Sequence, residues 1–386
     1  MSAPRPTLRY PARMRIVIVG GGIGGLTLAI ALQRLGHEPV VLERAPSLQP
    51  LGAGLTLQPN ALDVYRRLGL ADAILEAGAA LRGGELRSAD GRVLKSLDLA
   101  DTPGAPSEAA VGIHRGDLLE LLGDAAGDVV QWGAPVTDID VAEPAAILLD
   151  VARVGGDAVV GADGIHSAVR QALFGPRAPR YAGYTCWRGV CDHRDDDGLF
   201  EAWGRGQRFG AVPIGGGRTY WFATADAPEG GQDDGDPLPS LLTRFAGWAA
   251  PVADLLQGTP AGSVLRNDII DRPPTPRWGR GPVTLLGDAA HPMTPNMGQG
   301  AGQSIEDAWV LARCVTEGDD AEAAFRAYES ERMPRTRWMV ERSESFGKVG
   351  QWSHPAACWL RDRAVSLAPA SAGRAALLRA VGHRVR

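Results

Sequence analysis

The sequence predicts an α/β fold in which a domain of parallel strands and helices carries a second, mainly β domain and ends in a short helical tail. Three observations indicate this class. A strand–helix–strand pattern opens the chain, β-rich sequence fills residues 181–270, and helical periodicity returns from residue 305. The 386 residues are enough for two to three domains.

The first elements follow from local patterns. An apolar strand is expected at 15–19, a helix from about 24 to 35, and a second strand at 39–43. Strand-rich sequence then runs through 80–160, interrupted by a short helix at 115–122. These alternating elements favour a parallel sheet covered by helices.

The later elements are a β region and a helical region. Residues 181–270 read as mostly β, and the triplet Gly215–Gly217 predicts a hairpin turn. Helical periodicity covers 305–315 and 321–328 and resumes beyond Pro334. We therefore expect the chain to finish on helices.

The composition excludes several classes of protein. Hydrophobic residues make up 45% and charged residues 22%, which is typical of a globular chain and not of a disordered one. A net charge of −5 argues against a nucleic-acid-binding surface. No stretch reaches about 18 apolar residues, so we expect no transmembrane segment, and residues 1–13 lack the apolar core of a signal peptide.

Cysteine usage points to a reducing compartment. Cys186, Cys191, Cys314 and Cys358 form no CxxC pair, and no histidine cluster has metal-ligand spacing. A chain of this size does not need disulfides for stability. We therefore expect reduced thiols, no metal and a cytoplasmic location.

A glycine fingerprint follows the first strand. Gly20, Gly22 and Gly25 form G-x-G-x-x-G between the strand and the helix. The first glycine permits a tight turn, the second lets a pyrophosphate approach the backbone, and the third lets helix and strand pack closely. Glu43, at the end of the second strand and next to Arg44, is placed to hold ribose hydroxyls. The pattern predicts a Rossmann-like dinucleotide-binding domain.

Two later segments narrow the choice of cofactor to FAD. GADGIHSAVR at 161–170 and LLGDAAHPMTPNMGQGAGQSIEDA at 285–308 resemble the second and third motifs of the p-hydroxybenzoate-hydroxylase-like family, the single-component FAD-dependent aromatic hydroxylases of group A. GAGLTLQPNALDVYRRLGL at 52–70, IHRGDLLELL at 113–122 and YAGYTCWRGV at 181–190 match further, in the family's order. The resemblance runs from Met14 to about Gly350.

The resemblance implies a domain division. An FAD-binding domain would be assembled from residues 14–80, 108–180 and 272–350, and a β-sheet substrate domain from residues 81–107 and 181–271. Residues 351–386 would form the helical tail. No second G-x-G-x-x-G unit is present for NADPH or NADH, which fits a reductant that binds transiently.

The resemblance also assigns roles at the FAD site. Asp163 and Gly164 would serve the pyrophosphate region and the approach of the nicotinamide, and Arg115 would lie against FAD. Gly287 brings the backbone close, and Asp288 would hold a ribityl hydroxyl. The segment before the helix at 305–315 would direct a helix N-terminus at the flavin, where a positive dipole end stabilises negative charge.

Three residues of that segment complete the expected site. Gln299 and Gly298 would contact FAD. Pro295 and Gly298 would shape the wall near the oxygen-reactive carbon of the flavin. No histidine or cysteine lies in a flavin-attachment context, so the FAD is expected to be non-covalent.

A pair of residues in the β region is a candidate substrate contact. Strand alternation puts Arg208 and Gly210 on one face, and pairing across the glycine turn would bring Tyr220 to the same face. Arginine offers a planar fork and tyrosine a hydroxyl donor to a polar ring substituent. The pair resembles a substrate-contacting pair in the urate-hydroxylating branch, which carries Asp where this chain has Asn296.

The expected activity is that of an FAD-dependent, NAD(P)H-driven monooxygenase. It would insert one oxygen of O2 into an electron-rich aromatic or heteroaromatic small molecule through a flavin C4a-hydroperoxide. Two alternatives stay open: alkene epoxidation within the same family, and an FAD-binding reductase or sensor without oxygenation. The expected partners are the aromatic substrate and O2, without nucleic acid, and a homodimer is left open.

Overall fold

The computed structural model describes residues 13–48, 53–98, 110–150, 152–192, 198–369 and 378–385. Gly52 of a matched motif and parts of the expected segments 81–107 and 351–386 lie outside these residues.

A five-stranded parallel sheet forms the core of the first half of the fold. Its strands, in spatial order, are β18 (Val283–Leu285), β12 (Ala158–Gly161), β1 (Arg15–Val19), β2 (Glu38–Glu43) and β8 (Val130–Trp132). Both faces are covered, so the central strands are nearly continuous apolar runs, as in RIVIV of β1. The strand expected at 15–19 is confirmed, and the second begins one residue earlier than expected.

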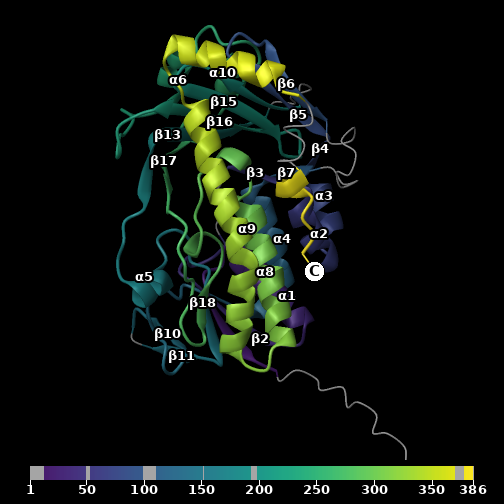
Figure 1. The fold of residues 1–386 in the computed structure, drawn as a ribbon, viewed down its shortest axis with the longest axis vertical. Helices are drawn as coiled ribbons and strands as arrows, with labels where there is room; N and C mark the ends of the chain where they lie inside the picture. Colours follow the sequence, from purple (N-terminus) through teal and green to yellow (C-terminus); the bar gives the residue numbers. More distant parts are fainter. Residues whose placement is uncertain are drawn as a thin grey trace, which may run out of the picture.

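Helices cover this sheet (Figure 1). Helix α1 (Ile23–Arg34) packs against α8 (Gly300–Glu317) and α4 (Arg115–Ala126), and α2 (Pro59–Arg67) packs against α8 and α3 (Ala71–Ala77). The remaining small elements lie around them. They are α5 (Ala168–Phe174), the sheet β9 (Val136–Asp140), β10 (Ala145–Leu148) and β11 (Arg153–Gly155), and the sheet β3 (Gly54–Leu57), β7 (Ala110–His114) and β4 (Ala79–Leu81).

A seven-stranded sheet lies at the other end of the molecule (Figure 1). Its strands, in spatial order, are β17 (Leu265–Asp271), β13 (Arg180–Cys191), β16 (Thr219–Asp226), β15 (Gln207–Pro213), β14 (Leu199–Trp203), β5 (Gly83–Ser88) and β6 (Val93–Asp98). The expected hairpin turn is confirmed: Gly215, Gly216 and Gly217 join β15 to β16 with φ of 83°, 62° and 71°. Only glycine adopts three such values in a row without strain.

The two faces of this sheet have different neighbours. One face carries Trp187, Phe209 and Trp221 and packs on α6 (Leu238–Arg244) and α7 (Val252–Gln257). These two helices interrupt a region expected to be mostly β, because its strands need an apolar cover on that side. The opposite face, termed the inner face, packs in part against Ala53, Leu81 and Ala110. The inner face consists of Tyr184, Cys186, Arg188, Val190, Arg208, Gly210, Val212, Tyr220, Phe222 and Thr224.

Helix α9 (Ala321–Gly350) connects the two halves. It runs from the parallel sheet to the seven-stranded sheet (Figure 1). The expected interruption at Pro334 is absent, since the proline lies inside this continuous 30-residue helix. Buried ion pairs of Arg332 and Arg335, on either side of the proline, hold the helix in place.

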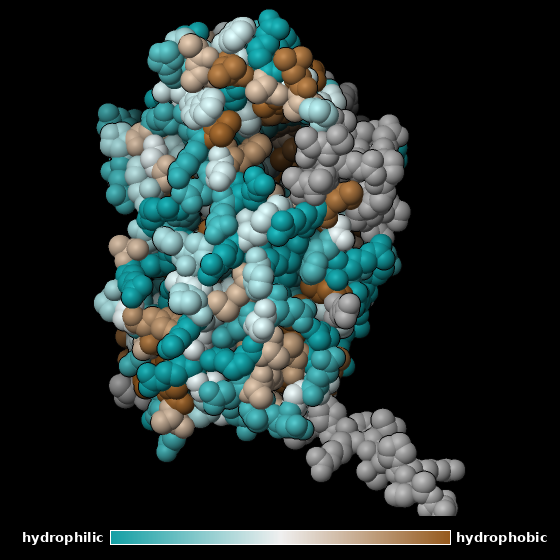
Figure 2. Space-filling model, viewed as in Figure 1, coloured by the Kyte–Doolittle hydropathy of each residue, from teal (hydrophilic) through white to brown (hydrophobic). Residues whose placement is uncertain are grey.

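Helix α10 (Pro355–Leu367) lies across the outer end of the molecule, where Figure 2 shows apolar surface. Trp359, Leu360 and Leu367 of this helix are exposed, whereas Cys358 and Arg361 are buried. Among the helices within the described ranges, none combines the length and the apolar composition that crossing a membrane requires. The four cysteines are buried and form no disulfide.

Candidate active site

A cavity of about 770 Å³ opens at the carboxyl ends of β1, β2, β12 and β18. Ligands of open α/β sheets bind at this edge, and the volume lies in the range of cofactor sites. Its lining includes Gly20, Gly22, Glu43, Arg44, Arg115, Asp163, Gly164, Gly287 and Asp288. Nine of the expected cofactor-binding residues are therefore brought together around one space.

The three glycines of the fingerprint have different structural roles. Gly20 has a φ of +108° and donates its N–H to the Leu42 carbonyl oxygen at 2.8 Å. A Cβ on Gly25 would lie 2.0 Å from the Gly20 carbonyl oxygen, so Gly25 permits the contact of helix and turn without lining the cavity. A Cβ on Gly22 would meet no protein atom within 4 Å and would project into open space.

Glu43 is fixed at the rim by two backbone donors. Its carboxylate accepts the N–H of Gly21 at 2.7 Å and the N–H of Ala45 at 2.9 Å. These bonds hold an acidic group beside the glycine turn, where a ribose would lie. Arg44 and Arg115 also line the cavity and are exposed to solvent, so both offer positive charge to a pyrophosphate.

Asp163 follows β12 and has one oxygen without a protein partner. Its Oδ2 accepts the N–H of Ala168 at 2.7 Å, whereas Oδ1 is buried and has no hydrogen-bond partner among the described residues. Burial raises the pKa of this carboxyl, and hydrogen bonds from Ser167 and the backbone oppose the rise. An unpartnered buried acceptor beside Gly164 is what a ligand group would satisfy.

Asp288 has its carboxyl open to the cavity although protein surrounds it. That burial raises the pKa of Asp288, and the nearby His291 and Arg115 oppose the rise. Gly287 has a φ of +61°, and a Cβ there would lie 2.4 Å from the Ser304 hydroxyl oxygen. The N-terminus of α8, at Gly300 and Ala301, lines the same cavity and presents its positive end there. The open glycine turn, the unpartnered Asp163 oxygen and the cavity-facing Asp288 together fit FAD.

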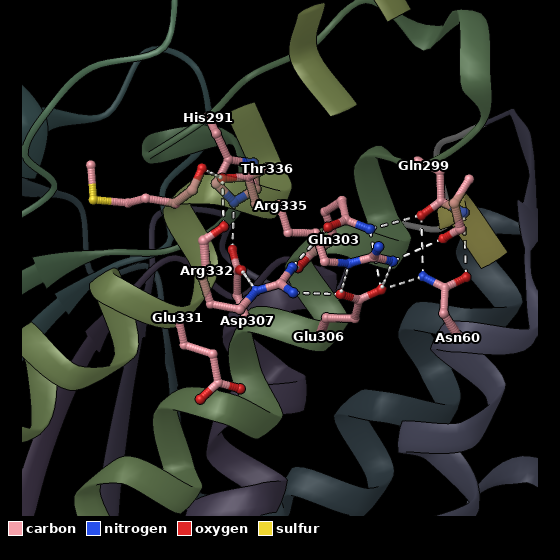
Figure 3. Close-up of polar contacts among 12 residues, drawn as sticks. Asn60, His291, Gln299, Gln303, Glu306, Asp307, Glu331, Arg332, Arg335 and Thr336 are labelled. Atoms are coloured by element: carbon pink, nitrogen blue, oxygen red, sulfur yellow. Dashed lines mark hydrogen bonds and ion pairs between the residues drawn. The ribbon is translucent and has the colours of Figure 1, made fainter. Parts of the chain in front are cut away.

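A buried polar network supports the loop that carries Asp288 (Figure 3). The Asp307 carboxylate accepts the N–H of Gly287 at 3.0 Å and ion-pairs with His291 and with Arg332. Burial alone would raise the pKa of Asp307, but the charges of His291 and Arg332 outweigh it and lower the pKa to about 2. The carboxylate therefore stays ionised and holds the cofactor loop.

The neighbouring carboxylate, Glu306, joins helices α8, α9 and α2. It ion-pairs with Arg332 and Arg335 of α9 and accepts an N–H of Asn60 at 2.6 Å. Burial acts to raise the pKa of Glu306, but the two arginines outweigh it and the pKa is lowered. Both acids are completely buried, so the arginines are essential to their charge.

The expected residues of the loop before α8 lie outside the cavity lining. The Gln299 side chain is buried and bonds to Gln58, Asn60 and Gln303, so it belongs to the polar network. Gly298 ends the short turn Pro295–Met297 with a φ of +59°. Pro295, Gly298 and Gln299 are not among the residues around the 770 Å³ space, whose edge is reached at Gly300.

Arg208 and Tyr220 both lie on the inner face, as the strand alternation predicts. All three guanidinium nitrogens of Arg208 have partners: Gln351 at 2.7 Å, Glu201 at 3.1 Å and Asn296 at 2.7 Å. The side chain is only 2% exposed. Its fork is therefore occupied by protein groups.

Asn296 is saturated by hydrogen bonds. Its amide oxygen accepts from Arg208 and from the Tyr184 hydroxyl, and its amide nitrogen donates to the Thr294 hydroxyl and to the Ser343 carbonyl at 2.9 Å. An aspartate would place a carboxylate oxygen against the Ser343 carbonyl, where both atoms are acceptors. This contact gives a physical reason for asparagine at the position where the urate-hydroxylating branch has Asp.

The sequence patterns did not predict the polar network around Glu306 and Asp307. Its signal is the adjacent pair Glu306–Asp307 within the mostly apolar buried face of α8, because two adjacent buried acids require cationic partners. His291 adjoins a cofactor motif, and its ring pairs with Asp307. The partners Arg332 and Arg335 lie 25 to 29 positions away.

Comparisons with known proteins agree with this site. The family described as FAD binding domain matches residues 13–181 and 271–343. The chain is 44% identical over 356 residues to the aurachin C monooxygenase/isomerase of Stigmatella aurantiaca, covering 91% of this chain and 93% of the relative. It is 33% identical over 374 residues to the 2-heptyl-3-hydroxy-4(1H)-quinolone synthase of Pseudomonas aeruginosa, covering 94% of this chain and 96% of that relative.

A solved structure is similar over almost the whole chain. Klebsiella pneumoniae HpxO complexed with FAD and uric acid superposes with a TM-score of 0.89 at 29% identity, covering 97% of this chain and 98% of that one.

The two fingerprint glycines give a matched pair of variants. Gly22→Ala should leave the thermal midpoint of the FAD-free protein unchanged and weaken FAD binding, because its methyl group enters only the cavity. Gly25→Ala should lower that midpoint, because its methyl group collides with the Gly20 carbonyl. Thermal unfolding of the apoprotein measures the midpoint of each variant, and titration with FAD measures its affinity. Equal behaviour of the two variants would contradict the separate roles.

Asp288→Ala should lower the affinity for FAD about ten- to a hundredfold, the worth of a hydrogen bond to a charged group. Fluorescence quenching on titration of FAD into the apoprotein measures the affinity. Asp254→Asn on α7, an exposed acid away from the cavity, is the control and should bind FAD normally. Unchanged affinity in the Asp288 variant would remove Asp288 from the site.

Arg332→Gln should destabilise the holoenzyme by about 3–5 kcal/mol, because Asp307 would keep a buried charge without its arginine. Arg313→Gln, which breaks ion pairs nearer the surface with Glu317 and Glu331, should cost about 1 kcal/mol or less. Urea unfolding followed by flavin fluorescence compares the two. Similar losses of stability in both variants would show that the buried ion pairs contribute no more to stability than those near the surface.

Proposed function

The chain belongs to the FAD-binding-domain family and is an FAD-dependent aromatic monooxygenase, and from this premise we propose that it hydroxylates the ring of a 2-alkyl-4(1H)-quinolone. The observation that carries the proposal is the 33% identity over 94% of the chain to a 2-heptyl-3-hydroxy-4(1H)-quinolone synthase. Hydroxylation of an aromatic ring is better supported than epoxidation of an alkene.

The inner face supports an apolar, bicyclic substrate. Tyr184, Val190, Tyr220 and Phe222 present aromatic and aliphatic surface next to a few polar groups. Small-molecule sites commonly combine such an apolar wall with a small number of placed polar groups. Urate is disfavoured because the Asn296 amide is committed to four protein contacts.

The proposed reaction balances with NADH or NADPH as the electron donor. A ring C–H, O2, NAD(P)H and a proton give a ring C–OH, water and NAD(P)+. Bound FAD supplies the electron transfer and the oxygen activation for this exchange. The protein contributes binding and orientation: Glu43 and Asp288 fix the cofactor, and the Asp307 network holds the Asp288 loop in place.

We propose a positioning role for Arg208 and a wall role for Tyr220. Arg208 ties β15 to the loop at Asn296 and to the end of α9 at Gln351, so it sets the spacing between sheet and loop. Pro295 and Gly298 lie in the turn that this spacing places against the inner face. Tyr220 packs against Gly54, where a Cβ would lie 2.4 Å from the tyrosine Cβ.

We also propose a division into two domains, the absence of a nucleic-acid partner and a cytoplasmic location. The division into the domains 14–80, 108–180 and 272–350, and 81–107 and 181–271, is supported by the strands that share each sheet. The net charge of −5 supports the absence of a nucleic-acid partner, and the four buried cysteines, which form no disulfide, support a cytoplasmic location.

Incubation of the purified enzyme with 2-heptyl-4(1H)-quinolone, NADH or NADPH and ¹⁸O2 tests the proposal. We expect a product with one added, labelled oxygen and NAD(P)H oxidation that depends on the quinolone. Urate under the same conditions is the comparison. Turnover of urate without turnover of the quinolone would refute the proposed substrate.

A further inference from the structure

Two arginines, Arg188 and Arg208, stand on the inner face of the seven-stranded sheet, and they differ in their partners. Arg208 has a carboxylate partner, Glu201, at 3.1 Å. Arg188 forms no ion pair with any acid of the described residues. Its guanidinium donates a hydrogen bond to the Asn267 amide oxygen at 3.3 Å, which is a neutral acceptor.

A guanidinium without an anion in a partly buried site is costly, because protein replaces water without supplying countercharge. The nearest polar groups on the inner face are the Cys186 thiol and the Tyr220 hydroxyl. Cys186 raises the pKa of Arg188, burial opposes this, and Tyr220 adds to the rise, so the side chain keeps its charge. Neither neighbour is ionised near neutral pH, since burial raises the pKa of both.

Arg188 is also the accessible member of its group. Cys186 and Tyr184 on the same strand are 2% and 3% exposed, and Tyr220 is 9% exposed, whereas Arg188 is only half-buried. Arg188 is therefore the most accessible of these four side chains.

Arg188 lies between two contacts with the FAD-binding half, one to strand β3 and one to the turn at Asn296. At one side Tyr220 packs on Gly54, directly before Leu55, which lines the FAD cavity. At the other side the Tyr184 hydroxyl donates to Asn296 at 3.1 Å, in the turn that leads to Gly300 at the cavity edge. A substrate ring lying against the inner face between these two contacts would meet the Arg188 guanidinium.

We propose that Arg188 binds the oxygen substituent of the substrate ring, an oxygen that carries full or partial negative charge, such as the O4 atom of a 4-quinolone or a phenolate oxygen. This deepens the proposed function and rests on it for the substrate class. A cation at that oxygen favours its anionic form, and an electron-rich ring is the form that accepts an electrophilic oxygen. The contact with the substrate that was expected of Arg208 is thereby assigned to Arg188.

Binding of two rings that differ by one oxygen tests the proposal. The holoenzyme, without NAD(P)H, is titrated with 2-heptyl-4(1H)-quinolone and with the oxygen-free 2-heptylquinoline, and the flavin absorbance reports binding. Arg188→Gln should weaken quinolone binding about ten- to a hundredfold and leave 2-heptylquinoline binding unchanged. Arg188→Lys should give an intermediate loss, because it keeps the charge but not the planar fork.

The matched control is Arg266→Gln. Arg266 lies on the adjacent strand β17 opposite Trp187, so it faces away from the inner face, and it ion-pairs with Asp233. This variant should keep both affinities. Equal losses for both rings in Arg188→Gln, or no loss for the quinolone, would overturn the assignment of Arg188.

A second pair of rings separates this inference from the proposed substrate. Titration with 1-naphthol and naphthalene compares an oxygenated and an oxygen-free bicyclic ring without the quinolone. If the quinolone does not bind but 1-naphthol binds in an Arg188-dependent way, the proposed substrate fails and the role of Arg188 stands. If the wild type shows no preference for the oxygenated member of either pair, the role of Arg188 is refuted.

Discussion

The burial of two adjacent carboxylates on α8 is the constraint on which the rest of the site depends. Glu306 and Asp307 are sealed from water, so each must be neutralised by groups brought from elsewhere. Arg332 of α9 contacts both, which fixes α9 against α8. The other carboxylate oxygen of Asp307 accepts the Gly287 N–H and pairs with His291. The ion pairs thus hold helix packing and the cofactor loop in one arrangement.

Helix α9 carries this arrangement to the second half of the protein. Arg332, in its first half, pairs with α8, and Gln351 at its C-terminal end accepts from Arg208 of the seven-stranded sheet. Between these points, the Ser343 carbonyl accepts from Asn296 in the turn before α8. One rigid helix therefore sets the distance between the FAD cavity and the inner face. A monooxygenase needs such rigidity, because a misplaced ring fails to meet the activated oxygen.

Two arginines on one sheet face show how neighbours decide a residue's role. Arg208 is bonded to three protein groups and braces the sheet, whereas Arg188 is half-buried and faces neutral partners. Their chemistry is identical, and only the presence of Glu201, Asn296 and Gln351 around one of them separates the two. The same reasoning explains Asn296, whose amide nitrogen donates to the Ser343 carbonyl, a contact that an ionised carboxylate does not make.

The sequence by itself determined the features that depend on contiguous residues. The glycine turn at Gly20, the strand-end acids Glu43 and Asp288, and the hairpin at Gly215–Gly217 are set by local conformation, and all lie where their patterns predict. Tertiary structure alone decided the rest. Two of the three partners of Arg208, Asn296 and Gln351, lie 88 and 143 positions away. Helix α9 passes through Pro334 because the distant Glu306 ion-pairs with arginines on both sides of the proline. A pattern can place a side chain on a face, but only the folded chain determines whether its charge already has a partner.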